Sequence, residues 1–264
     1  MYNFEYHRPS SVGDAVRLLS LRPSAKLLAG GQTLIPTMKQ RLAQPSDLID
    51  LARVPHLDGI RLNGKRITIG AMAKHAEVAE STDVARVVPA LARLAGKIGD
   101  AQVRNRGTLG GSIANADPAA DYPAAVVGLA AAVRTNKREI PADDFFQGLF
   151  ATALDADEIV VSVSFPLPEK AAYAKMPHPA SRFAVVGVFV AKTANGARVA
   201  VTGAGPSVFR VKAMETALDR KFAPGSLDGI GVPADDLNED LHASREYRAH
   251  LIPILARRAV AGCA

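Results

Sequence analysis

Two pairs of glycines constrain the fold of this chain most: Gly30-Gly31 and Gly110-Gly111. Residues 25–29 have the pattern of a short buried strand, and residues 33–42 carry apolar side chains at helical spacing. The first pair is therefore the turn of a strand–turn–helix unit. Such a turn lets the backbone approach a ligand closely, and N–H groups at a helix start favour an anion such as a diphosphate. Paired glycines also form ordinary turns, so this alternative stays open.

The second glycine pair repeats this chemistry further along the chain. Thr108 and Ser112 provide hydroxyl groups around Leu109-Gly110-Gly111, and Asp117 and Asp121 follow. Two such turns could close on one diphosphate from both sides. Neither has the spacing of a Rossmann fingerprint or a P-loop, which disfavours NAD and ATP. Capping of helices that begin near the next prolines is the alternative role of the two aspartates.

The remaining sequence alternates between strand and helix patterns. The expected strands are 25–29, 48–51, 66–70, 159–165, 183–192 and 198–202. The expected helices are 12–19, capped by Ser10-Ser11, then 33–42, 74–99, 211–218 and 243–261. The alanine-rich stretch 124–132 is typical of a buried helix or strand, and 224–240 of a loop.

Composition excludes several classes of protein. A chain of 264 residues with 48% hydrophobic and 22% charged residues folds into one or two domains. The single cysteine, Cys263, provides no disulfide framework and no iron–sulfur ligand set. The six histidines are dispersed, so we expect no metal site. The first residues lack the pattern of a signal peptide and no apolar run is long enough for a membrane span, so we expect a cytoplasmic protein.

The net charge of +6 raises the question of nucleic-acid binding. Lysine and arginine are spread along the chain, only 5% of residues are aromatic, and no nucleic-acid motif is present. This pattern favours a solvated basic surface that faces a partner or an anionic ligand. The densest basic group near the second glycine pair is Lys97, Arg104 and Arg106.

Two long motifs carry a family resemblance. Residues 28–36 (LAGGQTLIP) and 98–121 (IGDAQVRNRGTLGGSIANADPAAD) are together similar to the FAD-binding medium subunit of molybdenum hydroxylases, the carbon monoxide dehydrogenase and xanthine dehydrogenase family. Residues 157–160 and 242–248 also resemble family segments, so the resemblance covers nearly the whole chain.

The resemblance implies an α+β fold of the vanillyl-alcohol-oxidase (PCMH) type, with FAD between two subdomains. The implied division is an N-terminal FAD-binding subdomain at 1–55, a second FAD-binding subdomain at 56–172, and a C-terminal α+β domain at 173–264. The sequence departs from the family at Ser112, where many members have Asn, and in residues 176–183. Residues 222–236 form a segment that is compressed compared with the family pattern.

Site residues follow from the resemblance by motif. Ala29–Thr33 and Thr108–Ser112 would hold the pyrophosphate, and Asp121 a polar part of FAD. Val160 would pack on the nucleotide half and Lys175 would lie near the flavin. Phe183 would either cover the flavin ring or belong to the strand core. The full expected set is Leu28, Ala29, Gly30, Gly31, Gln32, Thr33, Leu34, Ile98, Thr108, Leu109, Gly110, Gly111, Ser112, Asp121, Val160, Lys175 and Phe183.

The implied function is electron transfer within a heterotrimeric oxidoreductase. Substrate would react on a molybdopterin-binding large subunit, and electrons would pass through a small subunit with a 2Fe–2S cluster to FAD and then to an external acceptor. No catalytic residue is expected in this chain. The alternatives are a self-sufficient flavin oxidase of the same fold and a non-catalytic basic binding module.

Overall fold

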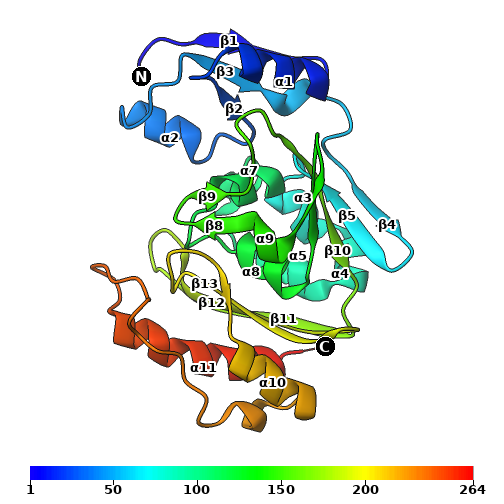
Figure 1. The fold of residues 1–264 in the computed structure, drawn as a ribbon, viewed down its shortest axis with the longest axis vertical. Helices are drawn as coiled ribbons and strands as arrows, with labels where there is room; N and C mark the ends of the chain where they lie inside the picture. Colours follow the sequence, from blue (N-terminus) through cyan, green and yellow to red (C-terminus); the bar gives the residue numbers. More distant parts are fainter. Residues whose placement is uncertain (264) are drawn as a thin grey trace.

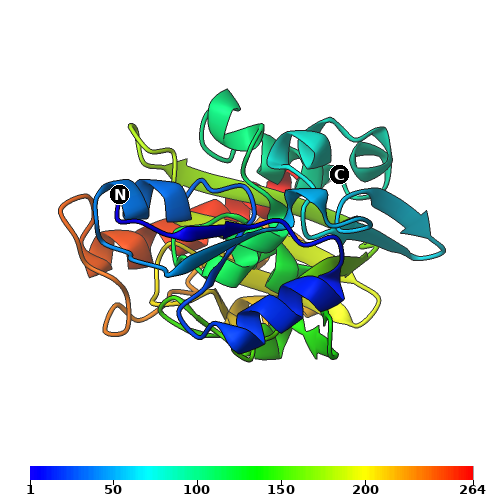
Figure 2. The ribbon, with the colours of Figure 1, turned by 90° about the horizontal axis from the view of Figure 1, so that it is seen from above.

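The structure is a computed structural model that describes residues 1–263. It has three layers stacked along its long axis, with the N-terminal layer at the top of Figure 1 and the C-terminal helices at the bottom. Seen from above, the N-terminal sheet and its first helix lie over the rest of the molecule (Figure 2). Among the helices of residues 1–263, none has both the length and the hydropathy of a membrane span.

The N-terminal layer is a three-stranded parallel sheet in the order β1-β3-β2. Its elements are β1 (Glu5–His7), α1 (Val12–Leu21), β2 (Lys26–Leu28), α2 (Leu34–Lys39), β3 (Asp47–Asp50) and the short 3-10 turn η1 (Leu51–Arg53). Parallel neighbours need crossover connections, which α1 and α2 provide. The hydroxyl of Ser11 caps α1 by accepting a hydrogen bond from the backbone N–H of Asp14 at 3.0 Å, which confirms the expected helix start.

The middle layer is a five-stranded antiparallel sheet in the order β4-β5-β10-β6-β7, with a cluster of short helices. Its strands are β4 (Ile60–Asn63), β5 (Arg66–Gly70), β6 (Ala132–Thr135), β7 (Glu139–Pro141) and β10 (Val160–Pro166), with the separate hairpin β8 (Phe146–Gly148) and β9 (Ala151–Thr152). Its helices are α3 (His75–Glu80), α4 (Thr82–Val87), α5 (Pro89–Gly96), α6 (Ala101–Arg104), α7 (Leu109–Asn115), α8 (Tyr122–Gly128) and α9 (Ala142–Phe145).

The C-terminal layer is a four-stranded antiparallel sheet packed between helices on both faces. Its elements are β11 (Lys170–Pro177), β12 (Ala184–Thr193), β13 (Gly196–Thr202), β14 (Phe209–Arg210), α10 (Lys212–Arg220), the 3-10 turn η2 (Pro224–Leu227) and α11 (Arg245–Ala261). Helices α5 and α8 cover one face, and α10 and α11 cover the other. In β12, Val186, Val188 and Val190 therefore pack into one core, and Phe189 and Ala191 into the other.

The sequence-based elements differ from the structure in several places. The helical pattern at 74–99 is three helices, because Ser81 caps a new helix and Pro89 starts another. In the stretch 124–132, expected as a buried helix or strand, residues 124–128 belong to the buried helix α8 and Ala132 begins β6. Strand β11 begins at Lys170 and crosses the expected domain boundary at residue 172. The division into three domains stays a prediction.

Candidate functional site

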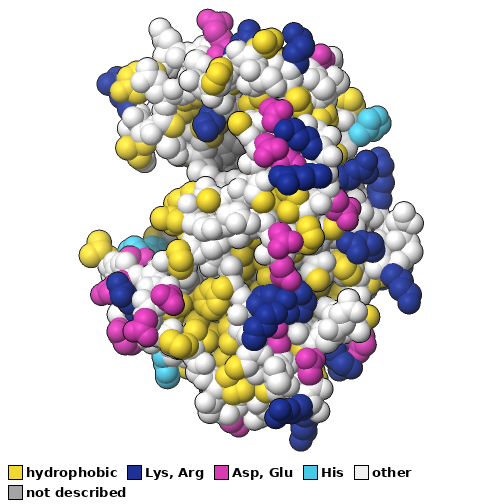
Figure 3. Space-filling view, in the orientation of Figure 1, with side chains coloured by type: hydrophobic (Ala, Val, Ile, Leu, Met, Phe, Trp, Pro, Cys, Tyr) yellow, Lys and Arg dark blue, Asp and Glu magenta, His cyan; other side chains and the backbone are white. Residues whose placement is uncertain are grey.

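A cleft of about 550 Å³ lies between the N-terminal and middle layers, and both glycine segments line it. The hollow between the two layers is visible at the upper left of Figure 3. The expected site residues in its wall are Ala29, Gly30, Gly31, Gln32, Thr33, Leu34, Thr108, Gly110, Gly111 and Val160. Two segments far apart in the sequence thus form one concave site.

The two segments touch each other, and glycine is required where they do. A Cβ atom on Gly30 would lie 2.1 Å from the backbone oxygen of Arg106, a contact that the backbone cannot accommodate. Gly31 has a φ of +73°, in the left-handed region that favours glycine. The glycines of the first segment therefore allow the turn and bring it against the second segment.

Backbone N–H groups of the first segment face the cleft without a protein acceptor. Within residues 1–263, the N–H groups of Gly30, Gly31, Gln32 and Thr33 donate no hydrogen bond to another residue. Successive free N–H groups in such a turn form an anion-binding concavity. Lys26 lines the same cleft and adds a positive charge. This part of the site fits the diphosphate of a dinucleotide.

The second segment uses its N–H groups differently from the sequence-based expectation. The N–H of Gly110 donates to the backbone oxygen of Ala71 at 2.8 Å, and the N–H of Gly111 donates to the Thr108 hydroxyl at 3.1 Å. A Cβ atom on Gly110 would lie 2.5 Å from that of Ala71. Gly110 is therefore required for close packing, and the second segment contributes shape to the cleft more than free donors.

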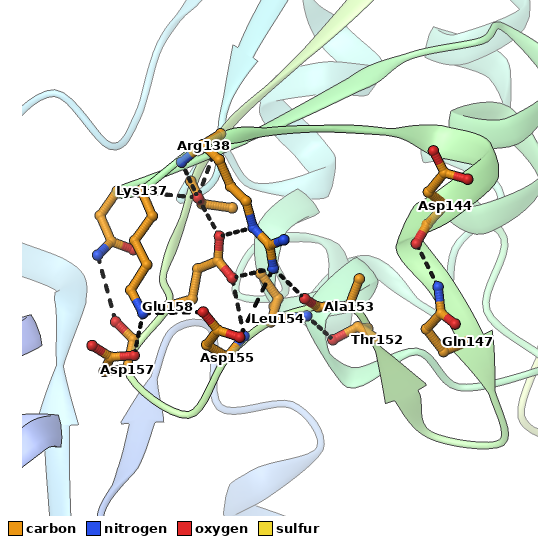
Figure 4. A network of polar contacts seen from close by, with 12 residues as sticks. Lys137, Arg138, Asp144, Gln147, Thr152, Ala153, Leu154, Asp155, Asp157 and Glu158 are labelled. Carbon is orange, nitrogen blue, oxygen red and sulfur yellow. Dashed lines mark hydrogen bonds and ion pairs between the residues drawn. The ribbon is translucent and has the colours of Figure 1, made fainter.

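A buried carboxylate, that of Glu158, fixes the wall of the cleft beside Val160. Its oxygens accept hydrogen bonds from Arg138 Nε and Nη2, each at 3.0 Å, from the Thr135 hydroxyl at 2.7 Å and from the Asp155 N–H at 3.0 Å (Figure 4). The Arg138 hydrogen bonds lower the pKa of Glu158 to about 2. The network holds the segment before β10 against the cleft.

Asp121 and Lys175 lie together but outside the cleft wall. Lys175 Nζ donates to the two Asp121 oxygens at 2.8 and 3.0 Å, and the Tyr173 hydroxyl donates at 2.6 Å. Burial raises the pKa of Asp121, and Lys175 and Tyr173 oppose this shift. Lys175 Nζ also donates to the backbone oxygen of Lys97 at 3.1 Å, so the pair joins β11 to the segment after α5.

The other expected residues have varied positions. Leu28, Ile98, Leu109 and Ser112 do not line the cleft, and Leu109 is fully buried in the core of the middle layer. Phe183 is half exposed and lines a second pocket. In the expected basic group, Arg104 donates hydrogen bonds to the backbone oxygens of Ile98 and Gly99, so its side chain supports the segment before α6.

Sequence reasoning missed several residues of the cleft wall, and those with polar or aromatic side chains include Lys26, Asn115, Phe150 and Glu158. Lys26 begins the strand that leads into the first glycine pair, so its position just before the motif could have indicated it. Phe150 gave no sequence signal because it reaches the site from the tip of the β8–β9 hairpin. Within residues 1–263, no group of three or more His, Cys, Asp or Glu side chains could hold a metal ion.

Comparisons with known proteins show the family of this chain. The family model described as the FAD binding domain in molybdopterin dehydrogenase matches residues 2–168. The carbon monoxide dehydrogenase medium chain of Hydrogenophaga pseudoflava is 36% identical over 282 residues, covering 99% of this chain and 98% of that protein. The nicotine 6-hydroxylase medium subunit of Paenarthrobacter nicotinovorans is 36% identical over 269 residues, covering 97% and 95%.

Solved structures have the same fold. A chain of carbon monoxide dehydrogenase from Hydrogenophaga pseudoflava superposes with a TM-score of 0.89 at 37% identity, covering 100% of this chain and 99% of that one. A chain of quinoline 2-oxidoreductase from Pseudomonas putida 86 superposes with a TM-score of 0.89 at 28% identity, covering 99% and 96%. This chain therefore belongs to the FAD-binding medium subunits of the molybdenum hydroxylase family, and its cofactor is FAD.

Proposed function

We propose that this chain is the electron-transfer subunit of a molybdenum-containing oxidoreductase and that FAD lies in the cleft between the two glycine segments. The observation that carries the placement of FAD is the row of unpaired N–H groups at Gly30–Thr33, which faces the same space as Thr108. Bound FAD accepts electrons singly and gives them up in pairs. The chain binds and orients it.

In this proposal, different residues of the chain contact different parts of FAD. The N–H groups of Gly30–Thr33, with Lys26, bind the diphosphate, and the Thr108 hydroxyl faces it from the second segment. Val160, held in place by the Glu158 network, packs on the nucleotide half. The Asp121–Lys175 pair lies near the flavin, where a buried ion pair provides a fixed local field.

The partners follow from the same assignment. Electrons arrive from a small subunit that carries a 2Fe–2S cluster, after substrate has reacted on a molybdopterin-binding large subunit, and leave to an external acceptor. The relatives support this division of labour: they are named for carbon monoxide, nicotine and quinoline, yet each has a chain that is similar to this one over nearly its whole length. Substrate choice therefore belongs to another subunit. A cytoplasmic location stays a prediction.

Reconstitution tests the electron route. The FAD-loaded chain is mixed anaerobically with substrate, first alone and then with its two purified partner subunits, and the visible absorbance of the flavin is followed. We expect loss of absorbance only in the full mixture. Reduction of the isolated chain by substrate would instead support the self-sufficient flavin oxidase, the alternative of the same fold.

A further inference from the structure

Phe150 connects the cleft with a neighbouring space. Among the described residues, it alone lines both the cleft and a second pocket of about 470 Å³ beside the β11–β12 turn. Phe183, which is expected at the flavin ring, lines this second pocket. FAD consists of a nucleotide half and a flavin half joined through the diphosphate. A cofactor with its diphosphate in the cleft and its flavin in the second pocket therefore passes Phe150.

The side chain of Phe150 stands out from the protein at the tip of the β8–β9 hairpin. It is 58% exposed, although it lines two concave spaces. Without a ligand, much of this apolar ring is in contact with water. Packing of the ring against a bound molecule removes that surface from water, which is favourable. The exposed ring is therefore available to a ligand that reaches both spaces.

The backbone at Phe150 is strained. Its φ of +52° lies in the left-handed region, which a bulky residue adopts only at a conformational cost. The neighbouring Leu149 is not among the residues with a positive φ, and it lines neither space. Glycine would form the same turn without strain. The strain therefore indicates a role for the phenyl ring itself rather than for the turn.

The base of the hairpin is fixed to the middle layer. The rings of Phe145 and Phe146 pack edge to face with their centroids 5.0 Å apart, and Phe145 is fully buried. Arg138 Nη2 donates to the backbone oxygen of Ala153 at 2.7 Å (Figure 4). The same guanidinium binds Glu158, whose network holds the cleft wall. The hairpin and the cleft wall thus share one anchor.

We propose that Phe150 closes over the middle of bound FAD and makes the site selective for the whole dinucleotide over its nucleotide half. This inference rests on the placement of FAD in the cleft. The ring packs on the part of FAD that runs from the diphosphate to the flavin, at the junction of the two spaces. A ligand that ends at the diphosphate, such as ADP, does not reach the ring. Phe150 therefore adds to the affinity for FAD and not to the affinity for ADP.

Titrations of the full-length apo chain with FAD and with ADP test the proposal. Phe150→Ala removes one aromatic packing surface, so it should weaken FAD binding by about 3- to 10-fold and leave ADP binding unchanged. Phe150→Tyr keeps the ring and should bind FAD like wild type. The matched control is Leu149→Ala, because this neighbouring side chain is 61% exposed and lines neither space. It should bind both ligands like wild type.

Thermal unfolding of the apo chain tests the strain. Phe150→Gly relieves the left-handed backbone, so it should unfold at a higher temperature than Phe150→Ala and bind FAD as weakly as that variant. At position 149 the order should be reversed, because glycine there only makes the unfolded chain more flexible. If Phe150→Gly is no more stable than Phe150→Ala, the strain on which the proposal depends is absent and the proposal is overturned.

Gly30→Ala in the first glycine segment separates this proposal from the placement of FAD. If Gly30→Ala weakens FAD binding and Phe150→Ala does not, the role of Phe150 is wrong and the placement stands. If Phe150→Ala weakens ADP binding as much as FAD binding, the ring only shapes the cleft and the proposal is overturned. If neither variant weakens FAD binding, the placement of FAD and the proposal both fail.

Discussion

At the scale of single residues, Lys26 is the side chain whose removal tests the diphosphate assignment. Lys26 is the only lysine or arginine among the described residues that line the cleft. A charged hydrogen bond to phosphate is worth about 1.5–3 kcal/mol, so Lys26→Ala should weaken FAD binding by roughly 10- to 100-fold. Lys39→Ala, an exposed lysine of α2 outside the cleft, is the control. Equal dissociation constants for the two variants in a fluorescence titration would contradict the assignment.

Glu158 predicts a pH dependence of folding. Its pKa is near 2 in the folded chain and about 4.5 when unfolded, so the folded state binds fewer protons between these values. The Arg138 interaction is fully present above pH 4.5 and is lost as the pH falls towards 2. Because Arg138 is half exposed, we expect a contribution of about 1–3 kcal/mol.

Urea unfolding at pH 7 and pH 3 measures this contribution. Glu158→Gln should be less stable than wild type at pH 7, and the difference should shrink at pH 3. The exposed carboxylate variant Glu80→Gln should follow wild type at both values. A stability difference that stays constant from pH 7 to pH 3 would show that Glu158 acts through packing alone.

At the scale of elements, the contact between the two glycine segments is the feature to perturb. Gly30→Ala places a Cβ against the backbone oxygen of Arg106 and forces the segments apart. We expect a loss of about 1–3 kcal/mol in FAD binding, or roughly 5- to 100-fold in the dissociation constant. Gly13→Ala in α1 has space for its Cβ and should retain full affinity. Full affinity in Gly30→Ala would refute the need for this contact.

The second glycine segment also depends on a buried histidine. His75 starts α3, its N–H donates to the backbone oxygen of Gly107 at 3.0 Å, and a Cβ on Gly107 would lie 2.6 Å from its Nε2. Burial lowers the pKa of His75 to about 4, so its ring is neutral at pH 7. Unfolded histidine titrates near 6.5, so stability falls as the pH drops from 6.5 to 4.

FAD binding should weaken over the same pH range, because a charged His75 disturbs the segment that it supports. The loss of folding stability should be up to about 3 kcal/mol. His75→Gln should lack this pH dependence, whereas His250→Gln, on the exposed side of α11, should keep it. Parallel FAD titrations at pH 7 and pH 5 check the prediction. A wild-type affinity that does not change with pH would count against the role of His75.

At the scale of the whole molecule, local patterns predicted the elements around the first glycine pair well. Ser11, the strand at 26–28 and the turn at Gly30-Gly31 are all set by neighbouring residues. Several strands were missed, among them β6, β7 and β11, because their burial depends on partners distant in sequence. The residue motifs predicted that two segments form one site, but not that Gly110 packs on Ala71 or that Phe150 reaches the cleft.

Hydrogen exchange of the apo and FAD-loaded chain, resolved to single amides, tests the central claim most directly. The N–H groups of Gly30–Thr33 have no acceptor within the described residues and should exchange quickly in the apo chain. FAD should slow their exchange strongly, while the Gly110 N–H, already bonded to Ala71, should be slow in both states. Unchanged exchange at Gly30–Thr33 with FAD bound would contradict the placement of the diphosphate in this cleft.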